Sequence, residues 1–392
     1  MHARTVTVLS MHTSPLAQPG AGDAGGMNVF VLHSALALAV AGFRVEIFTR
    51  SRQAFTKRPA SGVTVHGVPA GGDIPLSKEE LTHAVREFAE LVAAHPSYDP
   101  AAPVHSHYWL SGLVALRLHG RSHAPWVHTM HTTAAAKHRH SPGSVVDRPR
   151  AEAEALIGRR ADVLTANTEA DRTELIADLG AAPARVRVVS PGIDTHVFTP
   201  HGPAAEWPLA SRGARFLFAG RIQPYKGPQV AIEAIGLLAR RGAPVSLVLL
   251  GDRSGPGAED PAALAGGAGV ATRVLSLPPA PHKELAAWYR AADVVLVPSR
   301  HETYGLVAAE ALACGTPVIA HAVGGLNTLV HDGVDGRLLP SLDPAVWARA
   351  MAPVAMGGVP AHWRTAAAEA GASRGWDATA AALGGLYSVA SA

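Results

Sequence analysis

Cysteine is nearly absent from this sequence of 392 residues, since Cys314 is the only one. A single cysteine excludes an internal disulfide and a zinc site built on several cysteines. Charged residues are also few, at 17% against about 25% in ordinary globular proteins. Long hydrophobic runs are missing as well. The longest, Val29–Phe43, is broken by His33 and Ser34 and is shorter than the roughly 20 residues that a membrane-spanning helix needs. We therefore expect no integral membrane segment.

Blocks of basic residues are absent too, because the arginine pairs 159–160 and 240–241 are isolated and the net charge is only +3. Nucleic acid is therefore not an expected partner, whereas a small anionic ligand fits the mild positive charge. The first residues run directly into a β-type pattern without a signal-peptide core, which predicts a cytoplasmic protein. Hydrophobic residues make up 48% of the chain, so it has enough apolar surface to bury a core.

Short β-branched runs alternate with longer Ala- and Leu-rich runs, which is typical of βαβ units with parallel strands. The length exceeds that of one ordinary domain, and the Pro-, Gly- and His-rich stretch after Ser190 indicates a boundary near residue 195. We predict an α/β fold of two Rossmann-like, doubly wound parallel-sheet domains, residues 1–195 and 196–375. The C-terminal helix, residues 376–392, is expected to pack back on the first domain.

The expected strands are Thr5–Leu9, Val45–Phe48, Trp126–Thr129, Val163–Ala166, Arg187–Val189, Phe216–Phe218, Val245–Leu250, Val274–Leu277, Val294–Val297 and Val318–Ala320. The expected helices include Val29–Ala41, Lys78–Ala93, Gln229–Arg240, Lys283–Ala291, Gly305–Ala313 and Trp376–Val389. The Gly-rich stretch Gly251–Gly269 is expected to be a loop.

A glycine-rich loop precedes the first long helix. Its residues Gly25 and Gly26 allow backbone N–H groups to approach an anion at the helix N-terminus. A plain strand-to-helix turn is the alternative. The loop does not carry a Gly-x-Gly-x-x-Gly fingerprint, which disfavours a dinucleotide cofactor and with it a dehydrogenase.

A basic turn, Gly220–Gly227, follows the expected strand 216–218. Arg221 provides a bidentate fork and Lys226 a point charge, a combination that suits a diphosphate. The alternative is a solvated turn whose cations contact only water.

The segment Pro298–Ala311 gives the strongest signal in the sequence. A strand ends there, a polar loop carries Glu302, and a helix that contains Glu310 begins near Gly305. Backbone N–H groups at Tyr304–Leu306 would point at a phosphate, and the two carboxylates would accept hydrogen bonds from sugar hydroxyls. One glutamate near a helix start usually only compensates the helix dipole. Two of them, downstream of the cationic turn, favour a binding site.

The Glu302/Glu310 motif, the Arg221/Lys226 pair and the two-domain organisation resemble the retaining glycosyltransferases of the GT-B type, family 4. The first half is similar to one branch of that family, the D-inositol-3-phosphate N-acetylglucosaminyltransferases of mycothiol biosynthesis. The similarity covers residues 5–340 and rests on segments 11–16, 22–28, 76–81, 105–112 and 128–132.

The resemblance implies a GT-B fold, with two domains facing across a cleft, and transfer of N-acetylglucosamine from UDP-GlcNAc to an inositol phosphate with retention. The implied catalytic residues are Arg221, Lys226, Glu302 and His131. The implied donor-binding residues are Gly25, Gly26, Arg221, Lys226, Glu302, Thr303, Tyr304, Gly305, Leu306 and Glu310. The implied acceptor-binding residues are Asn28, Lys78, Tyr108, Thr132 and Arg150.

The resemblance also implies how the reaction proceeds. Arg221 and Lys226 neutralise the leaving diphosphate, so we expect no cofactor to be required, with Mg²⁺ as the alternative. The departing phosphate oxygen is expected to assist deprotonation of the acceptor during attack on the same face of the sugar.

Departures from the family pattern, chiefly Asp252-Arg253 and Thr303-Tyr304, leave the donor base and sugar open. One alternative is a paralogue of specialised metabolism that uses an ADP- or GDP-sugar and another phosphorylated acceptor, such as a nucleoside monophosphate. A sugar-nucleotide epimerase and a non-catalytic sugar-nucleotide-binding protein are further alternatives. The sequence does not fix the oligomeric state, for which a homodimer is the candidate.

Overall fold

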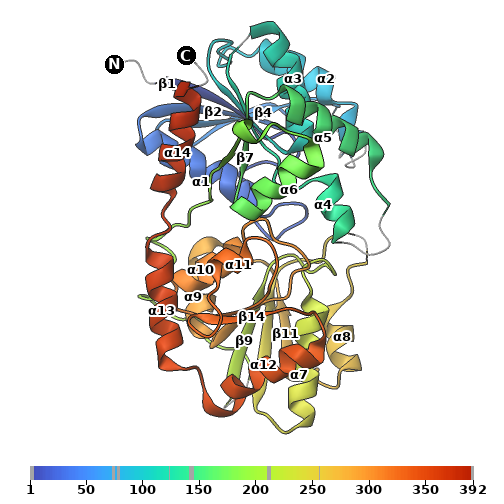
Figure 1. The fold of residues 1–392 in the computed structure, drawn as a ribbon, viewed down its shortest axis with the longest axis vertical. Coiled ribbons are helices and arrows are strands. Elements are labelled where there is room, and N and C mark those ends of the chain that lie inside the picture. The colour runs from blue at the N-terminus through green and yellow to red at the C-terminus, as the bar shows by residue number, and fades with distance from the viewer. Residues whose placement is uncertain are drawn as a thin grey trace. The chain divides into compact units, whose positions relative to one another are not determined.

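The computed structural model describes residues 4–72, 76, 80–122, 124–140, 145–209, 213–255 and 257–389. Two compact units divide the chain, and each is described by itself (Figure 1). Unit 1 contains the residues up to 17, residues 26–192, and the residues from 376 onward. Unit 2 contains residues 18–25 and 193–375.

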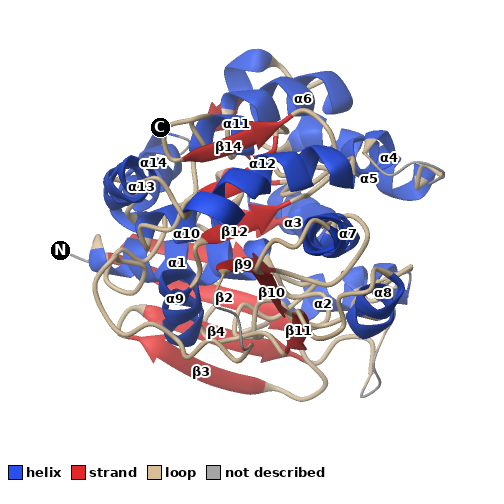
Figure 2. Ribbon diagram, turned by 90° about the horizontal axis from the view of Figure 1, so that it is seen from below, coloured by secondary structure: helices blue, strands red, loops and turns tan. Residues whose placement is uncertain are grey.

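Unit 1 is built on a sheet whose described strands follow the order β3-β4-β2-β1-β5-β6-β7-β8. Neighbouring strands pair in parallel, except that β3 at the sheet edge runs antiparallel to β4 (Figure 2). The central strands bury nearly all of their side chains, as expected for a parallel sheet that is covered on both faces. The strands are β1 (Arg4–Leu9), β2 (Phe43–Arg50), β3 (Phe55–Ala60), β4 (Val63–Val68), β5 (Val104–His107), β6 (Trp126–Thr129), β7 (Val163–Ala166) and β8 (Val186–Val188).

The described helices of unit 1 are α1 (Gly26–Val40), α2 (Val85–Ala93), α3 (Tyr108–Ser122), α4 (Ala134–Arg139), α5 (Arg148–Arg160), α6 (Glu169–Leu179) and α14 (Trp376–Val389), with 3-10 turns at Glu80–Thr82 and Pro183–Arg185. The C-terminal helix α14 packs against α1, as the red and blue helices of Figure 1 show. The Trp376 ring lies edge-on to Phe30, with 5.9 Å between ring centroids. At the other end of α14, the Tyr387 hydroxyl lies 2.7 Å from Nδ1 of His105.

Unit 2 has a second parallel sheet, of strand order β11-β10-β9-β12-β13-β14. Its strands are β9 (Ala214–Ala219), β10 (Val245–Leu250), β11 (Val274–Leu277), β12 (Val294–Val297), β13 (Val318–His321) and β14 (Gly336–Leu339). Its described helices are α7 (Pro228–Arg240), α8 (Pro261–Gly267), α9 (His282–Ala291), α10 (Leu306–Ala313), α11 (Leu326–Leu329), α12 (Pro344–Gly357) and α13 (Ala361–Ala372). Among the helices that the structure describes, none is both long enough and apolar enough to cross a bilayer.

The predicted pair of doubly wound parallel sheets is confirmed, but several elements differ from the prediction. The strands β3, β4, β5 and β14 were not expected. Residues 78 and 79 of the helix expected over 78–93 lie outside the described residues. In the described part of this range, the α-helix begins at Val85, because the 3-10 turn Glu80–Thr82 interrupts the 3.6-residue repeat. The expected loop 251–269 contains the short helix α8, whose N-terminus is capped by Asp260 through a 3.2 Å hydrogen bond from the Ala262 amide.

Candidate functional site

The strand order of unit 2 places the predicted donor residues of two loops beyond the carboxyl ends of the neighbouring central strands β9 and β12. The chain leaves β9 in one direction to β10 and returns to the other side at β12, so the sheet has its switch point between β9 and β12. Ligands of open α/β sheets bind beyond the carboxyl ends of the strands at such a point. The basic turn 220–227 follows β9, and the loop 298–305 follows β12.

Lys226 and Glu302, one from each of these loops, form an ion pair. The Lys226 ammonium donates to Oε1 of Glu302, and the Ser299 hydroxyl donates to the same oxygen at 2.8 Å. Burial by itself would raise the pKa of Glu302. The nearby lysine and these hydrogen bonds outweigh that effect, so the pKa lies below the usual value and the carboxylate is ionised.

The backbone beyond Glu302 requires glycine at two positions. Gly305, the N-cap of α10, has a φ of 108°, and a Cβ there would lie 2.7 Å from Leu326 Cδ2. Gly324 has a φ of 47°, and a Cβ there would lie 1.9 Å from the Glu302 carbonyl oxygen. The neighbouring Gly325 amide donates to that oxygen at 2.8 Å. The glycine turn therefore supports the loop that leads into α10. Thr303 and Tyr304 precede Gly305 in that loop, and Leu306 is the first residue of α10.

Glu310 lies on α10 and is 5% exposed. The Tyr289 hydroxyl of α9 donates to its Oε2 atom at 2.9 Å. Burial raises the pKa of Glu310 to about 8, although the tyrosine hydrogen bond opposes this shift. Sequence reasoning missed Tyr289, since no motif connects α9 with α10 and only the tertiary packing brings the two side chains together.

Arg221 is the second residue after β9, and its Nε atom would lie 3.8 Å from a Cβ at Gly25. Gly25 ends the segment 18–25, which belongs to unit 2. That segment is held by a hydrogen bond from the Asp252 amide to the Gly20 carbonyl (3.2 Å) and by one from the Gln18 amide group to the Ala280 carbonyl (3.0 Å). The predicted donor residues of the glycine-rich loop are thus divided, because Gly26 begins α1 of unit 1.

Three of the predicted acceptor residues come together in unit 1. The Arg150 guanidinium, from α5, donates through Nη2 to the Thr132 carbonyl at 2.9 Å. Its central carbon lies 4.9 Å from the centre of the Tyr108 ring. Lys78 lies outside the described residues. Asn28 is buried and donates to the Thr13 hydroxyl at 2.8 Å and to a neighbouring carbonyl, so it fixes the loop after β1.

Glu154 joins this acceptor cluster, although the sequence analysis did not single it out. Its Oε1 atom accepts from Nε of Arg150 at 2.6 Å, and its Oε2 atom accepts from the Ala134 amide at 2.8 Å. The side chain is 2% exposed. Burial raises the pKa of Glu154, and the Arg150 charge acts in the opposite direction. The i, i+4 spacing of the two residues on one helix was the available signal.

His131 follows β6 and has a φ of 61°, in the left-handed region. Its ring packs edge-on to Phe30, with 5.6 Å between ring centroids. Burial lowers the pKa of His131 to about 3, so the imidazole is neutral at physiological pH.

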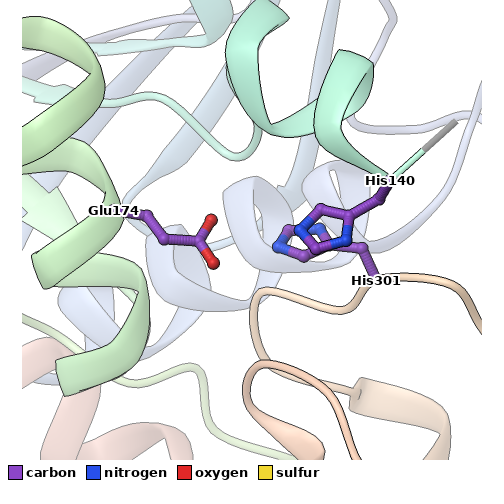
Figure 3. Close-up of side chains that lie close together, drawn as sticks. All are labelled: His140, Glu174 and His301. Atoms are coloured by element: carbon purple, nitrogen blue, oxygen red, sulfur yellow. The ribbon is translucent and has the colours of Figure 1, made fainter.

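Two possible metal ligands of unit 1, His140 at the end of α4 and Glu174 on α6, have ligand atoms within 4.8 Å of each other (Figure 3). Glu174 is also paired with Arg139, at 3.3 Å. Two protein ligands are fewer than the three or four of typical zinc sites. His301, drawn in the same view, belongs to unit 2.

Both units match known protein families. Residues 25–192 match the family described as "Glycosyl transferase 4-like domain", and residues 204–362 match the family described as "Glycosyl transferases group 1".

Individual proteins agree with these family matches. A D-inositol 3-phosphate glycosyltransferase from Paenarthrobacter aurescens is 45% identical over an alignment of 361 positions that covers 88% of this chain and 87% of the relative. A protein of the same name from Mycolicibacterium gilvum is 44% identical over 97% of this chain and 88% of the relative. The solved structure of sucrose-phosphate synthase from Thermosynechococcus elongatus superposes with a TM-score of 0.87 at 29% identity, covering 98% of both chains. This chain therefore belongs to the glycosyltransferases that join a 4-like domain to a group 1 domain, and it has the GT-B fold that its sequence predicts.

Proposed function

We propose that this glycosyltransferase transfers N-acetylglucosamine from UDP-GlcNAc to an inositol phosphate with retention of the anomeric configuration. The observation that carries the proposal is the cluster of Tyr108, Thr132 and Arg150 in unit 1. The Arg150 guanidinium contacts the main-chain carbonyl of Thr132 and the ring of Tyr108. The guanidinium and the two hydroxyls would together supply charge and hydrogen-bond donors to a phosphate monoester. The relatives named D-inositol 3-phosphate glycosyltransferase support the same acceptor class.

The donor is proposed to bind at the switch point of unit 2. Arg221 and Lys226 would offset the negative charge that develops on the departing diphosphate. The carboxylate of Glu302 would accept a hydrogen bond from a hydroxyl of the transferred sugar, and Glu310 would accept one from the ribose. Because these cations supply the neutralising charge, the reaction is proposed to require no metal.

Retention is proposed to follow because the acceptor hydroxyl attacks the anomeric carbon from the same face of the sugar that the diphosphate leaves. The departing phosphate oxygen would accept the proton of the acceptor hydroxyl as the new glycosidic bond forms. No enzyme carboxylate then needs to form a covalent intermediate.

The test is a matrix of sugar nucleotides against phosphorylated acceptors, read by mass spectrometry, with a parallel series in EDTA. UDP-, ADP- and GDP-sugars would be combined with inositol phosphate, unphosphorylated inositol and nucleoside monophosphates. We expect product from UDP-GlcNAc with inositol phosphate, none with inositol, and unchanged turnover in EDTA. If product forms only with another donor and acceptor, that pair replaces the proposed substrates. If the donor is epimerised and no transfer occurs, the protein is an epimerase instead of a transferase. Loss of activity in EDTA would favour Mg²⁺.

A further inference from the structure

Two residues of unit 1 adopt a backbone conformation that L-amino acids rarely occupy. Tyr108 has a φ of 69° and His131 a φ of 61°, and they are the non-glycine residues with positive φ in the described part of the chain. They follow the adjacent parallel strands β5 and β6. Such strain persists only where the surrounding structure enforces it, and it concentrates at functional sites.

His107 connects the two strained residues. It is the last residue of β5 and directly precedes Tyr108, and its Nδ1 atom lies 3.0 Å from Nε2 of His131. The two imidazole rings are 5.2 Å apart between centroids, and the Phe30 ring packs against both of them. His107 is 1% exposed, so its ring has little freedom to turn.

Both rings are neutral. Burial, together with neighbouring histidines, lowers the pKa of His107 well below its usual value, and burial lowers that of His131. A neutral imidazole has one N–H donor and one acceptor nitrogen. A hydrogen bond between the two rings therefore uses the donor of one and the acceptor of the other. As a consequence, the protonation of the remaining nitrogen of His131, Nδ1, is coupled to the tautomer of His107.

We propose that His107 is a positioning residue, which holds the imidazole of His131, a residue that the family resemblance implies to be catalytic, in one orientation and one tautomer. This inference rests on the proposed function, because it assigns His107 to the same reaction. A hydrogen-bonding group that is fixed in advance needs no reorganisation when the transition state forms. Its loss would consequently lower kcat more than it raises KM.

The kinetic test compares His107→Leu with His107→Asn. Leucine fills the space without a hydrogen bond, whereas asparagine restores a polar atom near the position of Nδ1. We expect kcat to fall about a hundredfold in His107→Leu, because a catalytic group that is misplaced by about 1 Å typically loses that much rate. KM for donor and acceptor should change little, and His107→Asn should recover most of the rate.

His128→Leu is the matched control. His128 is also fully buried and also makes an imidazole hydrogen bond, at 2.7 Å to the Ser106 hydroxyl rather than to His131. A loss of stability would affect both leucine variants alike, whereas a positioning role affects only His107→Leu. The proposal is overturned if the two variants lose the same rate, or if His107→Asn is as slow as His107→Leu.

A spectroscopic arm separates this inference from the proposed function. In protein with ¹⁵N-labelled histidine, the ring signals of His131, assigned with a His131→Gln variant, report its tautomer without any substrate. We expect a single tautomer in the wild type and in His107→Asn, and averaged signals in His107→Leu. Unchanged signals in His107→Leu would refute the positioning role even if transfer is observed. A single tautomer in an inactive wild type would refute the proposed function alone.

Discussion

Glu154 shows at the scale of one residue how a buried carboxylate holds an arginine of the proposed acceptor site. It accepts hydrogen bonds from Arg150 and from the Ala134 amide, so both of its oxygens are occupied. In Glu154→Gln, the side-chain NH₂ replaces one carboxylate oxygen, so it faces either the Arg150 guanidinium or the Ala134 amide, and one of these two hydrogen bonds is lost. Charged hydrogen bonds contribute about 1.5–3 kcal/mol, so we expect KM for the phosphorylated acceptor to rise at least about tenfold.

The exposed Glu152 of the same helix provides the control, because Glu152→Gln removes an equal charge without touching Arg150. Steady-state kinetics with phosphorylated and unphosphorylated acceptor measure the difference. Equal KM values in the two variants would show that Glu154 does not hold Arg150 for the phosphate.

Lys226 provides a test of the proposed donor site at the same scale. Lys226→Ala removes the proposed diphosphate cation and leaves the Glu302 carboxylate without its ion-pair partner. We expect transfer to fall by at least about a hundredfold, as for other groups that stabilise charge in a transition state. Lys283→Ala, at an exposed lysine of α9, should keep full activity. Full activity in Lys226→Ala, with an unchanged melting temperature, would remove the diphosphate clamp from the mechanism.

At the scale of elements, α14 shows how a distant segment completes a core. Tyr387 is 2% exposed, and its hydroxyl contacts Nδ1 of His105, whose Nε2 lies 2.8 Å from the Thr129 hydroxyl. Tyr387→Phe leaves the buried His105 nitrogen without this partner, which costs about 1–3 kcal/mol.

We expect the free energy of unfolding in urea to fall by that amount. Ala381→Gln, at an exposed position of the same helix, should change it by less than about 0.5 kcal/mol. If both variants are equally stable, the hydroxyl does not contribute to the docking of α14.

At the scale of the whole molecule, buried titratable groups make the stability of the two units depend on pH in opposite directions. Burial lowers the pKa of His128 and of His131 to about 3 in unit 1, whereas burial raises that of Glu310 to about 8 in unit 2. The unfolded chain binds protons on the histidines below about pH 6.5, so their contribution to stability is present above that pH and is lost as the pH falls toward 3. The Glu310 contribution has the opposite sign, since it is lost as the pH rises from about 4.5 to 8.

Scanning calorimetry between pH 7.5 and 5 tests this combination. We expect the transition of unit 1 to move to lower temperature as the pH falls from 6.5 to 5, before most carboxylates titrate, and that of unit 2 to move to higher temperature. The His128→Leu variant should show a weaker shift in unit 1. A unit 1 transition that does not move over this range would contradict the neutral burial of the histidines.

The sequence by itself determined the fold class, and it predicts the residues of the candidate site. Strands such as Val245–Leu250 are continuous apolar runs, and periodicity is a local property that one sequence displays. The histidine-rich strand β5 was missed, because its polar groups become compatible with burial only through partners elsewhere, such as Tyr387 for His105.

Only the tertiary structure decided which groups support the residues that the motifs mark. The family resemblance predicts Arg150, Glu310 and His131 as site residues. Their partners Glu154 and Tyr289 lie in no motif, and segment 105–112, which contains His107, does not mark this residue as the partner of His131. Sequence patterns report periodicity and loop chemistry along the chain. A buried hydrogen bond between separate elements depends on how these elements pack, and packing is settled only when the whole unit folds.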